Sequence, residues 1–219
     1  MTTWRRQQPL VVVLASLLIV GAATALVRAS AIGARLVALG APDAPDFRSR
    51  AGDADAFVGS ADLVLGLTVL LIAPCLIAWC WRAAKNQQAL GRRPERLGSG
   101  WAIGGWFVPL ANFVIPVLVV QDLWRGSDVA IERDDPRWRI ADRSWLVGWW
   151  WGLLVVAVVG ISGERADQPG VRISVLEQRN VLALLGSLAA AAAAILAASV
   201  VRMVTRRQDD CRRVQANAT

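Results

Sequence analysis

Four long blocks of apolar residues limit this chain to a small set of folds. They fall at about residues 9–27, 61–81, 145–161 and 181–201. Each block has the length of roughly 17 to 25 residues that a helix needs to cross a lipid bilayer. Because the bilayer core offers no water, a spanning helix must satisfy its own backbone hydrogen bonds. We therefore predict an all-α transmembrane helical bundle with four spans, in which residues 1–219 form a single membrane domain and 202–219 form a basic, mobile tail.

The composition agrees with a membrane protein and argues against catalysis. Hydrophobic residues make up 55% of the chain and charged residues 19%, which is less charge than soluble domains usually carry. The chain has no His, which is the commonest acid–base residue near neutral pH. Cys75, Cys80 and Cys211 have no metal-binding spacing, and we expect buried thiols. We expect no catalytic residue, no metal, no cofactor and a protein that is not an enzyme.

A fifth apolar block, residues 101–120, contains two prolines that bracket the polar side chain of Asn112. A proline inside a helix removes a backbone donor and frees the carbonyl one turn back. Pro109 and Pro116 therefore predict a broken segment, re-entrant or interfacial, in which Asn112 bonds to a freed carbonyl or to another helix. The alternative is a fifth span, because membrane helices tolerate proline.

The distribution of basic residues favours four spans. Cytoplasmic loops of membrane proteins are enriched in Lys and Arg. If residues 101–120 do not cross and the N-terminus is cytoplasmic, 17 of the 24 basic residues lie inside and 7 outside. A fully crossing block gives at best 14 inside and 10 outside. We therefore predict a multi-pass protein of the cell (inner) membrane with both termini in the cytoplasm.

Two further biases in residue usage bear on topology and source. In the four-span topology all eleven tryptophans lie at or near the cytoplasmic side, whereas a fifth span would divide them between the two sides. Of the 24 basic residues, 23 are Arg and one is Lys85. Together with abundant Ala and Val, this bias is typical of a GC-rich bacterial genome.

Four motifs stand out in the middle of the chain. They are "WCWRAAKNQQALG" (79–91), "GWAIGGWFVPLANFVIP" (100–116), "DLWRGSD" (122–128) and "GWWW" (148–151). Together they resemble the bacterial membrane family DUF4328. The resemblance covers about residues 60–165 and implies a membrane architecture with no established activity. One departure is "NFVIP", which is more apolar beside its second proline than in many members. The motif aromatics and prolines are Trp79, Trp81, Trp101, Trp106, Phe107, Pro109, Pro116, Trp124, Trp149 and Trp150.

A set of polar motif residues forms the candidate site. These residues could converge at the cytoplasmic mouth of the bundle, either to satisfy freed carbonyls and lipid phosphates or to form a pocket for an anionic ligand. Asp62 is expected at a helix start, where a carboxylate interacts favourably with the helix dipole. The candidate site residues are Arg82, Asn86, Asn112, Gln121, Asp122 and Arg125.

We expect a partner- or lipid-interacting protein that acts at the cytoplasmic leaflet. The expected partners are the bilayer with its anionic lipids and an unknown protein partner or a second copy of the chain; no nucleic acid is expected. Arg92, Arg93, Arg96 and the tail arginines would attract anionic lipid. The alternative is a small-molecule transporter or channel component, which would be expected to carry ionisable residues within its spans.

Overall fold

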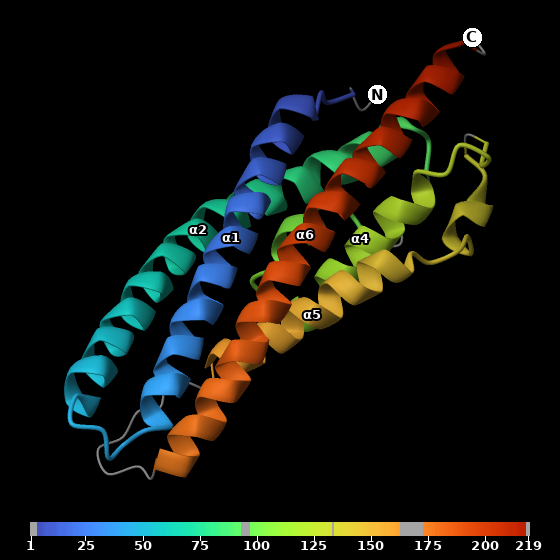
Figure 1. Cartoon of the computed structure of the whole chain (residues 1–219). Helices are drawn as coiled ribbons and strands as arrows, with labels where there is room; N and C mark the ends of the chain where they lie inside the picture. The colour runs from blue at the N-terminus through green and yellow to red at the C-terminus, as the bar shows by residue number, and fades with distance from the viewer. Residues whose placement is uncertain (1–3, 93–96, 133, 163–172, 218–219) are drawn as a thin grey trace. The chain divides into compact units, whose positions relative to one another are not determined.

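The computed structural model describes residues 4–92, 97–132, 134–162 and 173–217, and these residues form helices joined by turns and loops (Figure 1). The four longest helices are α1 (Gln8–Leu39), α2 (Phe47–Ala89), α5 (Trp145–Ser162) and α6 (Ile173–Asn217). Between α2 and α5 lie α3 (Trp101–Gly104), η1 (Ala111–Phe113), α4 (Ile115–Gly126) and η2 (Pro136–Arg139). In the described part of the chain, four helices are long and apolar enough to cross a membrane. The predicted all-α class and the four apolar helices are confirmed.

Three of the four long helices extend well beyond the predicted spans. α1 continues to Leu39, as the amphipathic sequence after its apolar block allows, and α2 begins at Phe47. The polar residues 47–60, which precede the predicted span at 61–81, are helical, and residues 40–46 connect α1 to α2. α6 runs to Asn217, so the expectation of a separate mobile tail at 202–219 is wrong for the described residues. Contacts between distant residues, described below, stabilise these polar extensions as helices.

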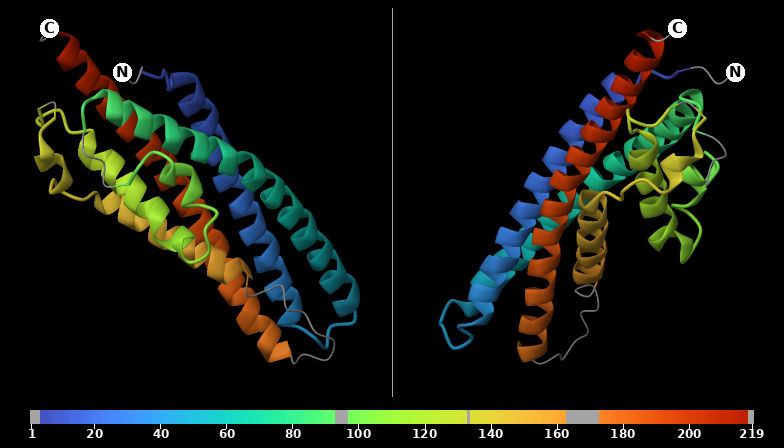
Figure 2. Two further views of the ribbon diagram at one scale, coloured as in Figure 1. Left: turned by 180° about the vertical axis from the view of Figure 1, so that it is seen from behind. Right: turned by 90° about the vertical axis from the view of Figure 1, so that its right-hand side faces the viewer.

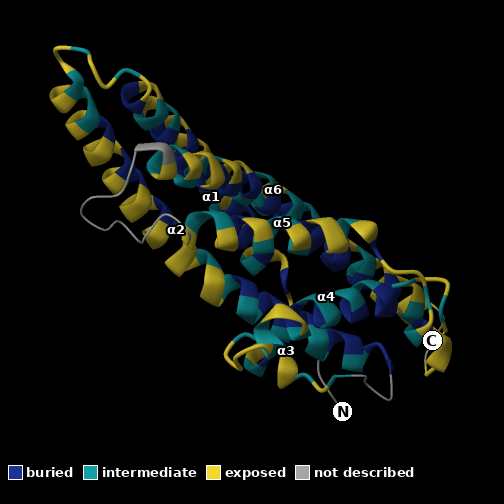
Figure 3. Ribbon diagram, turned by 90° about the horizontal axis from the view of Figure 1, so that it is seen from below, coloured by how far each residue is buried: buried dark blue, intermediate teal, exposed yellow. Residues whose placement is uncertain are grey.

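The chain divides into two compact units. Unit 1 consists of Met1–Ser16, Ile72–Trp149 and Leu196–Thr219, and unit 2 consists of Leu17–Leu71 and Trp150–Ile195. The long helices contribute one segment to each unit, and Figure 3 shows their buried and exposed residues. All 17 basic residues that the sequence predicts on one side of the membrane fall in unit 1, and the other 7 fall in unit 2.

Unit 2 contains a buried arginine that joins three helices. Arg28 on α1 is 1% exposed, forms an ion pair with Asp62 on α2 and donates to Ser187 Oγ on α6 at 2.7 Å. Asp62 therefore lies inside a long helix and pairs with a cation, so the expected helix-start role is wrong. Removing an isolated charge from water is costly, and the pair offsets that cost.

A second polar layer repeats the first one seven residues away on each helix. Arg35 on α1 pairs with Asp55 on α2 at 2.8 Å and donates to Asn180 Oδ1 on α6 at 3.5 Å. A spacing of seven residues returns to nearly the same helix face, so both layers lie along one seam. A shift of register between these helices would leave charges unpaired, so the two layers help to fix the register.

Small residues allow α5 and α6 to approach closely in unit 2. A Cβ on Gly160 would lie 2.7 Å from Leu182 O and 2.8 Å from the Gly186 Cα. Any larger side chain at this position would therefore force the backbones of the two helices to move. Membrane helices associate through such small residues because lipid provides no hydrophobic drive between helices. The Ala-rich sequence of α6 around this contact offers the same kind of small side chains.

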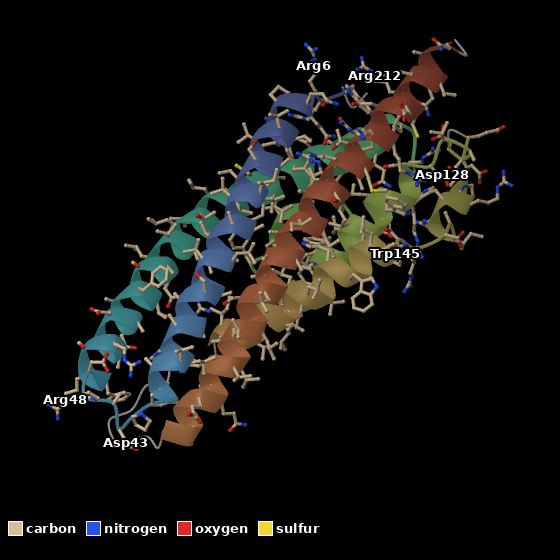
Figure 4. The ribbon with its side chains drawn as sticks, in the orientation of Figure 1. Arg6, Asp43, Arg48, Asp128, Trp145 and Arg212 are labelled. Carbon is tan, nitrogen blue, oxygen red and sulfur yellow. The ribbon has the colours of Figure 1, made fainter. Side chains whose placement is uncertain are left out.

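Polar side chains connect the helices of unit 1. Gln208 on α6 accepts from Gln7 Nε2 at 3.0 Å and donates to Ala83 O on α2 at 3.1 Å. The Trp79 Nε1 donates to Thr205 Oγ1 at 3.0 Å, and both residues are buried. Arg6 and Arg212 extend outward at the end of unit 1 that carries both chain termini (Figure 4).

The segment at 101–120 contains no helix long enough to cross a bilayer. Its helical parts are the short α3 and η1 and the first half of α4, and the turn around Leu110 has a φ of 64°. Pro109 precedes this turn and Pro116 lies in the first turn of α4, where its missing donor is not needed. Within unit 1, this segment lies at the end of α4 that points away from the chain termini (Figure 2).

Candidate functional site

Unit 1 contains a cavity of about 900 Å³ beside the C-terminal end of α4. The last turns of α4, the loop that follows it, the first residues of α5 and one face of α6 line this cavity. Asp128 and Trp145, two of the lining residues, are labelled in Figure 4. The lining is mixed, with four guanidinium groups and three carboxylates, those of Asp128, Asp135 and Asp142, beside apolar side chains. The four lining arginines are Arg125, Arg137, Arg143 and Arg207.

Arg125 is a buried cation that its own chain leaves almost unpaired. Its residue is 8% exposed, and its Nε has no hydrogen-bond partner among the described residues. Its ion pair with Asp122, one turn earlier on α4, is long at 3.9 Å. A guanidinium carries five donors, and a buried charge usually has close partners. The unused donors of Arg125 therefore make it the strongest anion-binding group of the cavity.

Arg207 reaches the same cavity from α6 and is held in place by three contacts. Its guanidinium lies 4.3 Å from the ring centre of Trp124, its Nε donates to Ser127 O at 3.2 Å, and its Nη2 lies 3.4 Å from Asp128 Oδ2. A guanidinium that stacks on an aromatic ring keeps its edge available for hydrogen bonds. Arg207 thus places a second positive charge on the wall of the cavity.

A buried arginine holds the loop that forms one wall of the cavity. Arg92 is 1% exposed and follows α2 in the sequence. It donates to four main-chain carbonyls, which are Gly126 O at 2.9 Å, Asp128 O at 3.0 Å, Ile131 O at 2.8 Å and Glu132 O. Gly126 ends α4, where carbonyls lack helical partners. Arg92 therefore positions this loop and is not available to lipid, contrary to the expectation; Arg93 and Arg96 lie outside the described residues.

Two glutamines fix α4 in unit 1. Gln121 and Ser144 exchange two hydrogen bonds, of 2.7 and 3.0 Å, which connect α4 to the start of α5. Gln87 on α2 donates to Asp122 O at 2.6 Å. Its amide also lies so close to Gly126 that a Cβ at this glycine would be 1.7 Å from Nε2. The sequence pointed to Gln121 and Asp122 but gave no sign of these partners.

The loop between α4 and α5 contains an ion pair within one turn. Asp135 accepts from the Arg137 backbone N at 2.8 Å and from its Nε at 2.7 Å, which caps η2. These hydrogen bonds lower the pKa of the Asp135 carboxyl below its ordinary value and raise the pKa of Arg137. Asp135 is therefore engaged with Arg137, and a ligand in the cavity would meet a carboxylate whose charge is already balanced.

A family model for a domain of unknown function, DUF4328, matches residues 43–206. The chain belongs to the DUF4328 family. The match extends beyond the region of about 60–165 in which the motifs were found, so it takes in the first turns of α2 and most of the apolar part of α6. No curated protein and no solved structure matches the chain.

The motif residues of this DUF4328 chain do not all converge. Arg125 lines the cavity, and Trp124 lies beside it. Asn86 is buried elsewhere in unit 1, where its side chain exchanges hydrogen bonds of 2.8 and 2.9 Å with the backbone of Arg5. Arg82 is half-buried and does not line the cavity. Of these residues, Trp124 and Arg125 both line the cavity.

The Asn112 side chain does not make the expected hydrogen bond, and two rings of the DUF4328 motifs pack against arginines from distant parts of the sequence. Asn112 was expected to bond to a carbonyl freed by proline or to another helix, yet its Oδ1 is buried without a partner and no hydrogen bond of its side chain to a described residue is present. The rings of Trp81 and Trp124 are covered by Arg5 at 4.5 Å and Arg207 at 4.3 Å, which come from other helices or segments.

The remaining motif aromatics lie on both the inside and the outside of the bundle. Trp79 and Trp150 are buried, and Trp150 packs edge-on against Trp151 with ring centres 5.6 Å apart. Trp149 is exposed, and so is Trp101. Exposed tryptophans suit a membrane interface, whereas the buried ones are packing residues. The missed site residues, Arg92 and Arg207, looked like ordinary flanking arginines in the sequence.

Proposed function

We propose that this chain is a multi-pass protein of a bacterial cell (inner) membrane that binds the headgroup of an anionic lipid at the cytoplasmic leaflet. The observation that carries the proposal is the Arg125 guanidinium, which is buried, lines the cavity and lacks a close partner among the residues that the structure describes. A phosphate can accept two parallel hydrogen bonds from one guanidinium. Such a ligand would supply the partners that the chain does not.

The charge distribution supports the cytoplasmic leaflet as the place of binding. Unit 1 holds the cavity and the 17 basic residues that the positive-inside rule assigns to the cytoplasm. The cytoplasmic leaflet is also the one that carries a negative surface potential from anionic lipids. On this proposal both chain termini, which belong to unit 1, are cytoplasmic.

The apolar part of the lining supports a lipid over a free phosphate. Trp145 and Leu146 begin the apolar helix α5, and Met203 extends the apolar face of α6. A headgroup held by Arg125 could leave its acyl chain along these side chains, whereas inorganic phosphate would gain nothing from them. The same chemistry binds both ligands, so the experiment below separates them.

A transporter or channel component is the alternative function, and Arg28 is the observation in its favour. Ionisable residues within membrane helices often mark a transport path. The Arg28 guanidinium, however, already has a carboxylate, a hydroxyl and a carbonyl as partners. This arrangement supports a structural role, and we therefore favour lipid binding, without catalysis, as the function.

Native mass spectrometry of the protein after purification in the presence of phosphatidylglycerol tests the proposal. Arg125→Gln should weaken retention of phosphatidylglycerol by about tenfold or more, because a hydrogen bond to a charged group contributes about 1.5 to 3 kcal/mol. Lipid retention by Arg125→Lys should lie between that of the wild type and that of Arg125→Gln, because an ammonium group cannot bind phosphate bidentately. Arg82→Gln is the matched control, because it removes an arginine of unit 1 that does not line the cavity.

Three results would count against the proposal. Equal retention by wild type, Arg125→Gln and Arg82→Gln would leave Arg125 with a structural role. Equal retention of phosphatidylcholine would remove the preference for an anionic headgroup. Displacement of bound lipid by millimolar inorganic phosphate would indicate a free phosphate as the ligand.

A further inference from the structure

The segment between α3 and α4 exposes apolar side chains that nothing in the described chain covers. We name residues 103–114 the apolar hairpin. Its most exposed side chains are Leu110 at 83% and Phe107 at 71%, and Phe113 and Val114 are about half exposed. From Trp101 to Val120 the sequence contains no charged residue, and Asn112 is its one polar side chain apart from the indole N–H groups. Contiguous apolar surface of this kind marks a site of contact with a partner or with lipid.

The backbone of the hairpin is closed upon itself. Every backbone N–H from Gly105 to Val114 donates to a carbonyl of the same segment, except that of Leu110, and Pro109 has no N–H to satisfy. The bonds are of the short-range kind, for example Phe107 N to Gly104 O at 3.1 Å and Val114 N to Ala111 O at 3.0 Å. Hydrocarbon offers no hydrogen bonds, so a segment placed in it must satisfy its own donors.

The base of the hairpin is tightly packed, whereas its tip is strained and open. A Cβ on Gly105 would lie 2.3 Å from Ile115 Cγ2, so the two arms meet closely there. Leu110, at the tip, has a φ of 64°, which a leucine adopts only at a cost. A large apolar side chain is thus held outward at the position where glycine would be the unstrained residue.

The place of the hairpin in unit 1 indicates what covers it. The last turns of α4 meet α6 at Arg207 and at Cys211, where Ser127 O accepts from both side chains. The hairpin is at the other end of α4, about 18 Å away for a helix of twelve residues and away from the chain termini (Figure 2). It therefore lies away from the charged end of unit 1, toward the apolar part of its helices.

We infer that the apolar hairpin inserts among the lipid acyl chains of the leaflet on the side of unit 1, with Phe107 and Leu110 at its tip. Its occupant is lipid and not a protein partner, because its backbone donors other than the Leu110 N–H are already satisfied and it carries no charged side chain for recognition. The inference does not depend on Arg125 or on the identity of the headgroup in the cavity.

Fluorescence quenching in vesicles tests this inference. The three cysteines, Cys75, Cys80 and Cys211, are replaced by alanine, and Leu110→Cys is labelled with an environment-sensitive nitrobenzoxadiazole group. The protein is reconstituted into phosphatidylcholine–phosphatidylglycerol vesicles. Val214→Cys is the matched control, because Val214 is an exposed apolar residue, at 52%, near the end of α6 in the same unit, and it does not line the cavity.

Insertion predicts opposite responses at the two sites. The label at Leu110 should emit at shorter wavelength, lose several-fold intensity in vesicles of lipid brominated on the acyl chains, and resist aqueous iodide. The label at Val214 should be quenched by iodide more strongly than by bromine. Phe107→Cys provides a second labelling site if the first variant does not fold.

Two outcomes would overturn the inference. Strong iodide quenching at Leu110 and Phe107 would place the hairpin in water. Protection of the labels at Leu110 and Phe107 from both bromine and iodide would mean that protein covers the tip. Cross-linking of Leu110→Cys between two copies of the chain would then identify the second copy as that protein. Because the readout is independent of lipid retention by Arg125, failure of one proposal would not be mistaken for failure of the other.

Discussion

Replacing Arg92 by methionine should release the loop that forms one wall of the cavity. Methionine keeps an apolar stem of similar length and removes all donors. Of the four carbonyls that Arg92 binds, Gly126 O is buried, and the other three are partly buried and can bind water instead. Leaving one buried carbonyl unsatisfied costs about 1 to 3 kcal/mol, and each partly buried bond contributes about 0.5 to 1 kcal/mol. These contributions add up to about 2.5 to 6 kcal/mol, and the central part of that range, about 3 to 5 kcal/mol, is the loss of local stability expected for residues 126–132.

Hydrogen exchange of the peptide that covers residues 123–132 measures this loss directly. Backbone N–H groups of Ser127 and Asp128 donate to carbonyls of α4, at 3.2 and 3.3 Å, and their protection reports the closed loop. A loss of 3 to 5 kcal/mol corresponds to exchange about a hundred to a few thousand times faster, up to the limit set by the free amide. Peptides from unit 2 serve as internal controls.

Two further variants separate the clamp from a general effect of charge. Arg92→Lys keeps the charge but cannot reach four carbonyls with one ammonium group, so its exchange should be intermediate. Arg82→Met removes an arginine that neither lines the cavity nor holds the loop, and exchange at 123–132 should not change. Exchange in Arg92→Met within threefold of wild type would refute the reasoning, because the four bonds would then contribute no stability.

Two other perturbations test unit 2 and the loop before α5. Gly160→Leu should lower the thermal unfolding temperature in detergent, because the new side chain would collide with Gly186; the expected loss in the free energy of unfolding is about 1 to 3 kcal/mol. Gly152→Ala on the same helix is the control, because its methyl group meets open space and should be neutral or slightly stabilising. The lowered pKa of Asp135 means that its bonds with Arg137 stabilise the turn above the ordinary Asp value of about pH 3.9 and are lost as the pH falls through the lower folded value. The protection factors of residues 134–139, which compare exchange with the intrinsic rate at each pH, should fall in that acidic range, and Asp135→Asn should abolish this pH dependence of protection. Protection that is insensitive to pH in the wild type would contradict this assignment.

Much of the architecture follows from the sequence alone. The lengths of the apolar blocks require helices that can span a bilayer, and the described residues contain four such helices. Pro109 and Pro116 remove backbone donors within the block at 101–120, so no continuous helix forms there. Both conclusions rest on the length and apolarity of a segment and on its missing backbone donors. These are local properties that can be read from consecutive residues.

The limits of the helices and the make-up of the site depended on tertiary contacts. The polar stretches at 47–60 and 202–217 are helical because partners far along the chain, such as Arg35 for Asp55 and Gln7 for Gln208, satisfy their side chains. Arg92 and Arg82 look alike in the sequence, yet one is fully buried among carbonyls and the other is half-buried outside the cavity. The carbonyls that Arg92 contacts lie 34 to 40 residues away along the chain. No local sequence pattern encodes which distant carbonyl or carboxylate a guanidinium will meet.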